Sequence, residues 1–401
     1  MNFNLKAPVT QYSLVTLSYW AFTLSDGALR MLVVLFFHQL GYSPIEIAGL
    51  LVLYELFGVI TNLYAGWLAT AIGLTVTMQM GLVLQIVALT MLMVDSSVLT
   101  VVYVMVAQAL SGIGKDLNKM GAKASIKSLV PADAQGRLYR WITLLTGSKN
   151  ALKGVGFFLG GWLLATVGFQ YAVATMAAAL AVVLVLSILL LDRNTGIAQN
   201  PKPFKHLCST SSAVNRLSAA RFFLFGSRDI WFVVAVPVFF HEHLHWSFTQ
   251  VGTFHAVWVI AYGAVQSSAP KLLKSADGSK EDKNKAFKLS LTLCISMGLI
   301  IAGSAIFGYN SYILVGGLMV FGFFFALNSS FHSYLILSFS KSDKAAMSVG
   351  FYYMANAIGR LFGTLLSGIL YQVGGLMACL IGSLSFLVIT SFISKKLNSQ
   401  K

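Results

Sequence analysis

Long runs of apolar residues, separated by short polar stretches, dominate this chain of 401 residues. A helix needs about 20 predominantly apolar residues to cross the hydrocarbon core of a bilayer, and the runs reach that length. The pattern therefore predicts an all-α integral membrane protein with twelve transmembrane helices. The predicted spans are residues 11–39, 46–70, 75–94, 98–118, 139–166, 170–191, 217–241, 249–271, 286–308, 312–338, 346–371 and 374–394.

Basic residues are concentrated in alternate connections between the predicted spans. The connections 115–140, 193–216, 271–288 and 341–344 carry lysines and arginines, as does the C-terminal tail. The other connections, such as GYSP after Leu40, are nearly free of them. Because lysine and arginine are enriched in cytoplasmic loops, both termini are expected in the cytoplasm.

The composition excludes several classes of protein. With 57% hydrophobic and 10% charged residues and a mean hydropathy of +0.77, the chain does not have the composition of a soluble protein. The formal charge of +15 would suggest nucleic-acid binding in a soluble domain, but here the basic residues alternate with membrane spans, so no nucleic-acid partner is expected. The scattered cysteines Cys208, Cys294 and Cys379 match neither a disulfide framework nor a metal motif. We expect no cofactor, no metal and no enzymatic activity.

The chain contains an internal repeat of about half its length. The segment LFFHQLGYSPIEIAG (35–49) aligns with VFFHEHLHWSFTQVG (238–252), and KGVGFFLGGWLLATVG (153–168) aligns with RLFGTLLSGILYQVGG (360–375). Two halves of six spans repeated in the same orientation resemble the major facilitator plan.

That resemblance implies a division of the chain into three parts. Residues 1–191 would form an N-terminal six-helix bundle, and 217–401 a C-terminal one. The polar stretch 192–216, which contains NPKPFKH, would be the cytoplasmic linker between them.

Acidic and basic residues within the first and seventh spans are the first candidates for a site. A charge at the centre of a membrane helix costs about 3 kcal/mol, so each needs a partner or a use. Asp26 and Arg30 are one helical turn apart and can pair with each other. The repeat places Asp229 opposite Asp26, and Arg228 precedes Asp229. We expect these residues to line the central path, with Asp26 or Asp229 coupling a proton; a purely structural ion pair is the alternative.

Lysines in the fourth and fifth spans form a second group of candidates. Lys115 and Lys119 are expected at the cytoplasmic mouth of an anion path, although lysines at a span end also snorkel to lipid headgroups. Lys153, one turn after Lys149, would lie about 20 Å along its helix, near the middle of the membrane. Its repeat counterpart is Arg360, and a matched pair of buried cations favours a binding role.

The balance of buried charge predicts the substrate class. Glu55 and Arg221 are further candidates, either for the site or as partners of other buried charges. Deep cations outnumber deep anions, and a positive, low-dielectric cavity attracts multiply charged anions. Arginine holds tetrahedral oxyanions bidentately, and lysine adds a point charge. The deep cations are Arg30, Lys149, Lys153, Arg221, Arg228 and Arg360, and the deep anions are Asp26, Glu55 and Asp229. The pattern predicts a transporter of organic, phosphate-like anions.

Four stretches resemble a particular branch of the superfamily. They are YWAFTLSDGALRMLVVLFFHQLGYSP, QALSGIGKDLNKMGAKASIKSLVP, YRWITLLTGSKNALKGVGFFLGG and SAARFFLFGSRDIWFVVAVPVF, and they are similar to the ArsJ-type organoarsenical efflux permeases. The resemblance implies secondary active export of 1-arseno-3-phosphoglycerate across the bacterial inner membrane, which confers arsenate resistance. Its implied partner is glyceraldehyde-3-phosphate dehydrogenase, which makes this substrate from arsenate, and the permease is expected to be a monomer.

The chemistry of pentavalent arsenic agrees with the residues, but it leaves one alternative open. Arsenate presents hard oxygens, which guanidinium and ammonium groups suit better than thiolates, and the spans are poor in cysteine. An organophosphate or other organic-anion antiporter of the same fold would use the same cations, so only transport assays separate the two. A sensor built on the fold would be expected to carry a large cytoplasmic output domain.

Overall fold

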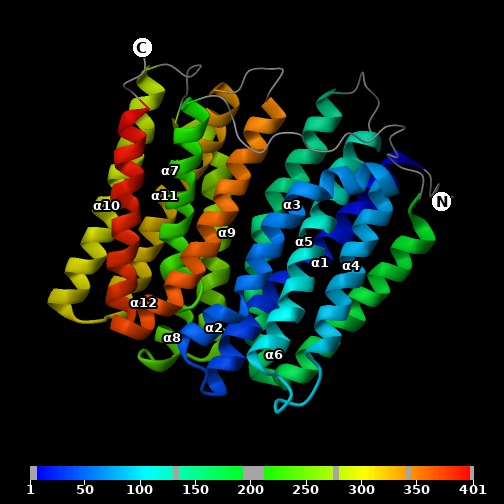
Figure 1. Ribbon diagram of the computed structural model, residues 1–401, viewed down its shortest axis with the longest axis horizontal. Coiled ribbons are helices and arrows are strands. Elements are labelled where there is room, and N and C mark those ends of the chain that lie inside the picture. The colour runs from blue at the N-terminus through cyan, green and yellow to red at the C-terminus, as the bar shows by residue number, and fades with distance from the viewer. Residues whose placement is uncertain (1–6, 130–134, 193–211, 274–279, 340–344, 398–401) are drawn as a thin grey trace. The chain divides into compact units, whose positions relative to one another are not determined.

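The computed structural model describes residues 7–129, 135–192, 212–273, 280–339 and 345–397, and these form helices joined by short connections (Figure 1). Residues 193–211 of the predicted linker lie outside this description. The helices are α1 (Pro8–Gln39), α2 (Pro44–Leu50), α3 (Val52–Ile72), α4 (Leu74–Met91), α5 (Val101–Leu129), α6 (Gln135–Leu190), α7 (Ser212–Phe232), α8 (Ala235–Glu242), α9 (Phe248–Leu273), α10 (Lys280–Phe307), α11 (Ser311–Phe339) and α12 (Ala345–Lys396).

The helices account for the twelve predicted spans. Eight stretches of the described residues are long and apolar enough to cross a membrane. Two of these stretches hold two segments each, because Gly168 (φ 78°) interrupts α6 and Gly375 (φ 62°) interrupts α12. Glycine adopts such left-handed φ values without the strain that a side chain would add. Gly168 lies in a predicted connection, and Gly375 is the second residue of the predicted span 374–394. These eight stretches therefore provide ten spans. The long helices α5 and α9, which are not among the eight stretches, occupy the two remaining predicted spans. The all-α, twelve-span architecture is thus confirmed.

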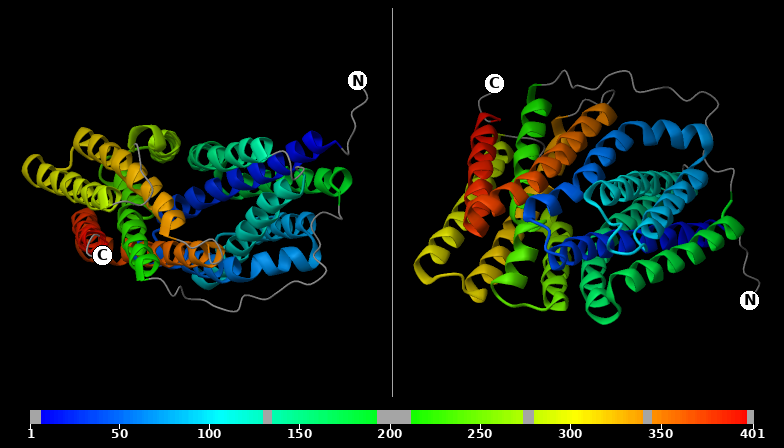
Figure 2. Two further views of the ribbon diagram at one scale, coloured as in Figure 1. Left: turned by 90° about the horizontal axis from the view of Figure 1, so that it is seen from above. Right: turned by 60° about the horizontal axis from the view of Figure 1, so that its bottom comes forward.

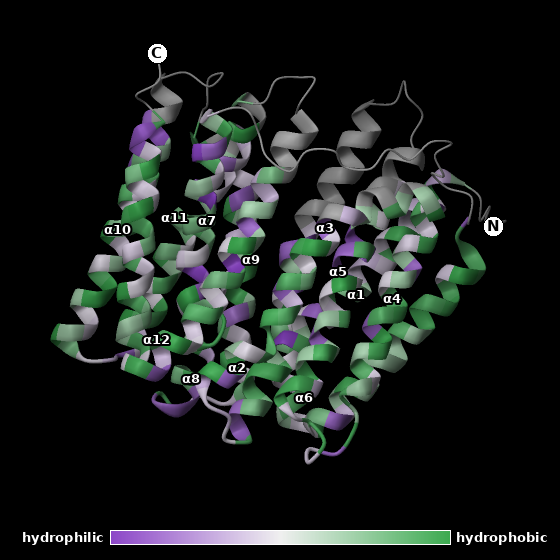
Figure 3. Ribbon diagram, viewed as in Figure 1, coloured by the Kyte–Doolittle hydropathy of each residue, from purple (hydrophilic) through white to green (hydrophobic). Residues whose placement is uncertain are grey.

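The surface of the helices suits a lipid environment. Figure 3 shows hydrophobic colouring along most turns of the long helices, with hydrophilic residues at several of the connections. Among the exposed side chains are large apolar ones on α6 and α10, such as Leu189 and Leu299. Apolar side chains on the outside of a helix are favourable when the surroundings are acyl chains rather than water.

The chain forms two compact units, and each has its long helices packed side by side (Figure 2). Unit 1 comprises Met1–Phe36 and Leu53–Phe204, and unit 2 comprises Phe37–Val52 and Lys205–Lys401. The short helix α2 belongs to unit 2, where the Gln372 side chain of α12 accepts a hydrogen bond from the Ile45 N–H at 3.3 Å.

Within each unit, glycines bring one pair of helices into backbone contact, and the two pairs are equivalent by the internal repeat. In unit 1 a Cβ on Gly156 of α6 would lie 2.6 Å from the Leu24 carbonyl oxygen and 3.1 Å from the Cα of Gly27, both in α1. In unit 2 a Cβ on Gly363 of α12 would lie 2.6 Å from the carbonyl oxygen of Gly226 in α7. The repeat alignment pairs Gly156 with Gly363, so both units repeat the same close crossing, as small residues permit in membranes.

The seventh span is interrupted between α7 and α8. The amides of Val234 and Ala235, which the break frees, both donate to the Ser367 hydroxyl of α12, at 3.2 and 3.1 Å. Side chains from neighbouring helices commonly satisfy backbone groups at such breaks within a membrane. The interruption lies about one helical turn after Asp229, and it is held in place by the helix that also carries Arg360.

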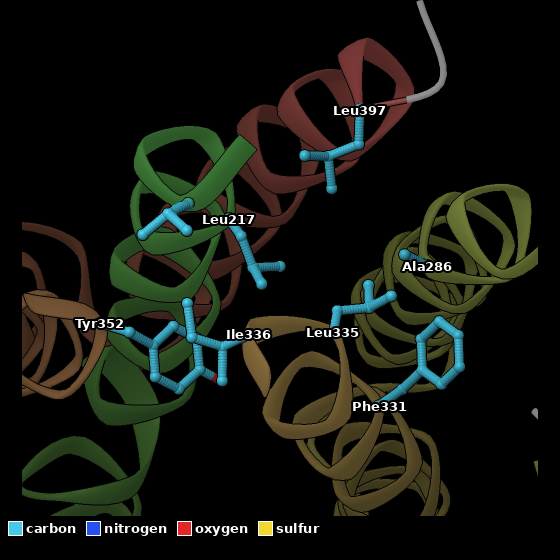
Figure 4. Packing of buried hydrophobic residues seen from close by; sticks show 8 residues of the cluster. Leu217, Ala286, Phe331, Leu335, Ile336, Tyr352 and Leu397 are labelled. Atoms are coloured by element: carbon cyan, nitrogen blue, oxygen red, sulfur yellow. The ribbon is translucent and has the colours of Figure 1, made fainter. Parts of the chain in front are cut away.

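An apolar cluster fills the end of unit 2 that contains the start of α7. Figure 4 shows Leu217 of α7, Ile336 of α11 and Tyr352 of α12 facing one another, and Leu335 lies near Ala286 of α10. These side chains are nearly or fully buried. The cluster joins four helices at the level just before Arg221 in α7.

Candidate functional site

Tyr54 of α3 is the centre of the charged cluster in unit 1. Its hydroxyl donates a hydrogen bond to the Asp26 carboxylate of α1. The Nζ of Lys115 in α5 lies 4.1 Å from the centroid of its ring, and the Arg30 guanidinium carbon lies 5.5 Å from it. Cations are attracted to the face of an aromatic ring, so one buried tyrosine of α3 connects an acid and a cation of α1 with a cation of α5.

Arg30 forms its ion pair with Glu55 rather than with Asp26. The Nη2 of Arg30 lies 2.9 Å from Oε1 of Glu55, and both side chains are buried. The one-turn spacing on α1 permitted a pair between Asp26 and Arg30, but the tertiary fold brings an acid from α3 to the arginine and a tyrosine hydroxyl to Asp26. Arg30 is thus neutralised within the protein.

A second cluster in unit 1 surrounds Asp116 of α5. Lys115 lies 3.6 Å from this carboxylate, and Lys119 forms a shorter ion pair with its other oxygen. Lys119 also donates to the Asn62 side chain of α3 at 2.9 Å. Gly58 of α3 leaves the room for these groups, since a Cβ there would lie 3.0 Å from the Asp116 carboxylate.

Lys149 and Lys153 of α6 are half-buried in unit 1. The charge of Lys149 acts on Asp116, so this lysine belongs to the same electrostatic neighbourhood as Lys115 and Lys119. The Nζ of Lys153 lies 5.7 Å from the centroid of the Phe157 ring, one turn further along α6. The glycines that follow Lys153 serve the packing against α1 described above.

In unit 2, Asp229 lies between two arginines. The Nε of Arg228 donates to its Oδ1 at 2.6 Å, and the Nε of Arg360, from α12, donates to its Oδ2 at 3.2 Å. Asp229 is fully buried, whereas 14% of the Arg228 side-chain surface and 20% of the Arg360 side-chain surface are exposed. The structure therefore brings together three predicted residues, and the side chains of both cations are partly exposed.

Arg221 is held by neutral groups. Its Nη1 donates to the backbone oxygen and the hydroxyl of Ser329 in α11, at 2.8 and 3.0 Å, and its Nε donates to the Asn356 side chain at 3.2 Å. The rings of Phe225 and Tyr352 lie 4.0 and 5.0 Å from its guanidinium carbon. Among the described residues no carboxylate forms an ion pair with this buried arginine.

Several residues of these clusters were not among the predicted site residues. Tyr54, Asn62, Ser329 and Asn356 are neutral side chains within apolar spans, so no local pattern distinguishes them from packing residues. Asp116 is different, because an acid between two predicted lysines, Lys115 and Lys119, could have been recognised from the sequence as a member of the site.

Both units contain an excess of cations at these sites. In unit 1 the five predicted cations Arg30, Lys115, Lys119, Lys149 and Lys153 accompany three acids, Asp26, Glu55 and Asp116. In unit 2 the three arginines Arg221, Arg228 and Arg360 accompany one acid, Asp229. Among these residues each unit therefore has two more cations than acids, a distribution that attracts anions.

Comparison with known families identifies the class of protein. The sequence profile of the Major Facilitator Superfamily matches residues 15–279, which is more than half of the chain. The chain belongs to the Major Facilitator Superfamily. It is a multi-pass membrane protein and a membrane transporter of that type.

Solved structures of transporters share the fold over nearly the whole chain. One is a POT family transporter in complex with a thioalcohol-conjugated peptide (TM-score 0.77, 12% identity, 96% of each chain covered). Another is a bacterial homologue of the iron transporter ferroportin in an inward-facing state (TM-score 0.73, 14% identity, 98% of this chain and 99% of that chain covered). The comparison with curated proteins found no match. At these identities the likeness concerns the fold alone.

Proposed function

We propose that this transporter exports the anionic organoarsenical 1-arseno-3-phosphoglycerate by alternating access and so confers arsenate resistance. Glyceraldehyde-3-phosphate dehydrogenase supplies the substrate when it uses arsenate in place of phosphate. The protein acts as a monomer in the bacterial inner membrane with both termini in the cytoplasm. Its two six-helix bundles, 1–191 and 217–401, move about the site while the linker 192–216 joins them.

The observation that supports the proposal most is the excess of cations over acids at the sites of both units. A buried cation without an acid is expensive in a membrane protein, and the sites described in unit 2 place three arginines, Arg221, Arg228 and Arg360, beside one buried acid, Asp229. A bound oxyanion would supply the missing negative charge. The arginines can each form two parallel hydrogen bonds to a phosphate-like or arsenate-like group.

The clusters differ in the roles we assign to their residues. Arg228 and Arg360 bind oxyanion oxygens directly, because their side chains are partly exposed and share one carboxylate. Lys115, Lys119, Lys149 and Lys153 attract the anion from the cytoplasmic side of unit 1. Arg30 has a structural role, since Glu55 neutralises it. Asp26 and Asp229 are the candidates for proton coupling.

The described cysteines fit a pentavalent arsenical better than an arsenite. The thiol of Cys379 contacts the backbone oxygen of Ser367 at 3.6 Å, and that of Cys294 contacts the Ser391 hydroxyl at 3.4 Å. Arsenite is bound by thiolates, whereas arsenate oxygens prefer cationic hydrogen-bond donors. The cations of both units match the second chemistry.

Arsenate tolerance of a sensitive bacterial strain tests the proposal. The strain expresses this chain alone, the dehydrogenase alone, or both, and its growth is measured against arsenate and, separately, arsenite. Protection against arsenate that needs both proteins supports export of the organoarsenical. Protection against arsenite, or arsenate protection by this chain without dehydrogenase activity, would contradict it.

An organophosphate or other organic-anion antiporter of the same fold is the second candidate. It is favoured by the same contacts, because arginine forks bind phosphate as well as arsenate. Uptake of 3-phosphoglycerate into vesicles loaded with inorganic phosphate distinguishes it. Rapid exchange in that assay, with no dehydrogenase-dependent arsenate protection, would favour the antiporter.

A further inference from the structure

Two guanidinium groups of unit 2 lie against the same aromatic ring. The guanidinium carbon of Arg221 is 4.0 Å from the centroid of Phe225, and that of Arg228 is 5.1 Å from the same centroid. The two carbons are therefore at most about 9 Å apart, the sum of these distances. Arg221 and Arg228 are also two helical turns apart on α7, which places them on one face of that helix.

Among the described residues, each of the two positions has one more arginine than it has carboxylates. At the first, Arg221 is bound by the neutral groups of Ser329 and Asn356. At the second, Arg228 and Arg360 share the single carboxylate of Asp229. A molecule with one anionic group at each end would match this distribution, whereas a molecule with a single anionic end would leave one position uncompensated.

Neutral polar groups next to Arg221 provide additional donors. The Tyr262 hydroxyl lies 3.0 Å from the Ser329 hydroxyl, and the Gln266 amide donates to Tyr262 at 3.0 Å. His332, one turn after Ser329 on α11, is fully buried, and neither of its ring nitrogens has a hydrogen-bond partner among the described residues. A buried polar group without a partner is costly, and a bound oxyanion could accept a hydrogen bond from this imidazole.

We propose that unit 2 by itself binds both ends of an elongated dianion. One oxyanion group binds at Arg221, beside Ser329 and Tyr262, and the other binds at Arg228 and Arg360. The ligand class is a short-chain compound with an oxyanion at each end, such as a three-carbon acid phosphate. The inference rests on the anion transport proposed above.

Two three-carbon phosphates that differ at one end provide the test. 3-Phosphoglycerate carries a carboxylate where glycerol 3-phosphate carries a neutral hydroxymethyl group. Their dissociation constants are measured by calorimetry on the full-length protein in lipid nanodiscs. The wild type should bind 3-phosphoglycerate at least about tenfold more tightly, a difference of about 1.4 kcal/mol. In Arg221→Gln the ratio should fall to about one.

Arg216→Gln is the matched control. Arg216 lies on the same helix, but its guanidinium donates to the backbone oxygen of Lys396 at 2.8 Å, away from the two positions, so the tenfold ratio should persist. A wild type that binds both phosphates equally, or an Arg221→Gln variant that keeps the preference, would overturn the two-position site. If Arg221→Gln does not fold, the ratio of the two dissociation constants of the wild type alone tests the two-position site. Binding of neither phosphate, together with no arsenate protection, would instead overturn the proposed function.

Discussion

Each unit contains a buried aspartate that forms ion pairs with two cations, Asp116 in unit 1 and Asp229 in unit 2, but the two groups are built differently. In unit 1, Asp116 is flanked by Lys115 and Lys119, and all three residues lie on α5. In unit 2, Asp229 is flanked by Arg228 of α7 and Arg360 of α12. The first group is therefore local to one helix, whereas the second joins two helices directly.

This difference indicates how the units divide structural and binding roles. In unit 1, 22% of the Lys115 side-chain surface and 24% of the Lys119 side-chain surface are exposed. Because these side chains are flexible, their ammonium groups can reach water if the Asp116 carboxylate is removed. In unit 2 the guanidinium group of Arg228 lies against the rings of Phe225, Phe232 and Phe325, which hold this planar group in place. Unit 2 thus has the more rigid arrangement for orienting an oxyanion.

The largest expected effect is that of Asp229→Asn. The substitution leaves two partly buried arginines without their acid, and breaking a buried ion pair costs about 3–5 kcal/mol. Asp116→Asn should cost less, because its lysines can turn toward water. Chemical unfolding of both variants in detergent micelles measures the difference. An equal or larger loss for Asp116→Asn would remove the distinction between the two groups.

The ion pair between Arg30 and Glu55 should behave as a structural unit. Glu55→Gln and Arg30→Gln should each lower the free energy of unfolding by about 3 kcal/mol, because each leaves one buried charge alone. The double variant should lose clearly less than the sum of the two, as expected for residues in contact. Unfolding of all three variants tests this, and strictly additive losses would show that Arg30 and Glu55 do not interact.

The glycine crossings should respond alike in the two units. In Gly156→Ala and Gly363→Ala the new methyl group would lie 2.6 Å from a backbone oxygen, and overpacking of this kind costs about 1–3 kcal/mol. Gly298→Ala is the control, since nothing lies within 4 Å of its Cβ position, and alanine there should be neutral or stabilising. Tolerance of alanine at either crossing would show that the helices can separate without loss.

The smallest expected effect concerns two tyrosine hydroxyls. Tyr54→Phe keeps the ring that faces Lys115 but removes the hydrogen bond to Asp26, at a cost of about 1 kcal/mol. Tyr262→Phe removes the contact with Ser329 at a similar cost. Only Tyr262→Phe should also weaken binding of 3-phosphoglycerate, because Ser329 holds Arg221. Equal weakening by both variants would show that the anion depends on both units.

Much of the fold could be predicted from the sequence, because membrane spans leave a strong signal. Turns at Gly168 and Gly375 were recognisable as short breaks between apolar runs, and the two units do repeat the crossing of Gly156 and Gly363. The interruption between α7 and α8 was not predicted. It depends on the Ser367 hydroxyl, which comes from a distant part of the chain.

The site was predictable only where charge itself was the signal. Arg228 and Asp229 are adjacent in sequence, and the repeat pointed to Arg360. The choice of Glu55 over Asp26 as the partner of Arg30 depends on how α1 and α3 pack, which helix spacing does not determine. Ser329 and Asn356 are uncharged, so their contacts with Arg221 could be found only in three dimensions.

The most direct test of the different roles of the two units compares export by two variants in which charged side chains are replaced by glutamine. Loss of cell-associated arsenic is followed in arsenate-loaded cells that express the dehydrogenase together with Arg228→Gln or with the Arg30→Gln/Glu55→Gln double variant, at equal membrane levels of transporter. The account predicts that the double variant exports and that Arg228→Gln does not exceed cells without transporter. Export by Arg228→Gln at the wild-type rate, with none by the double variant, would contradict it.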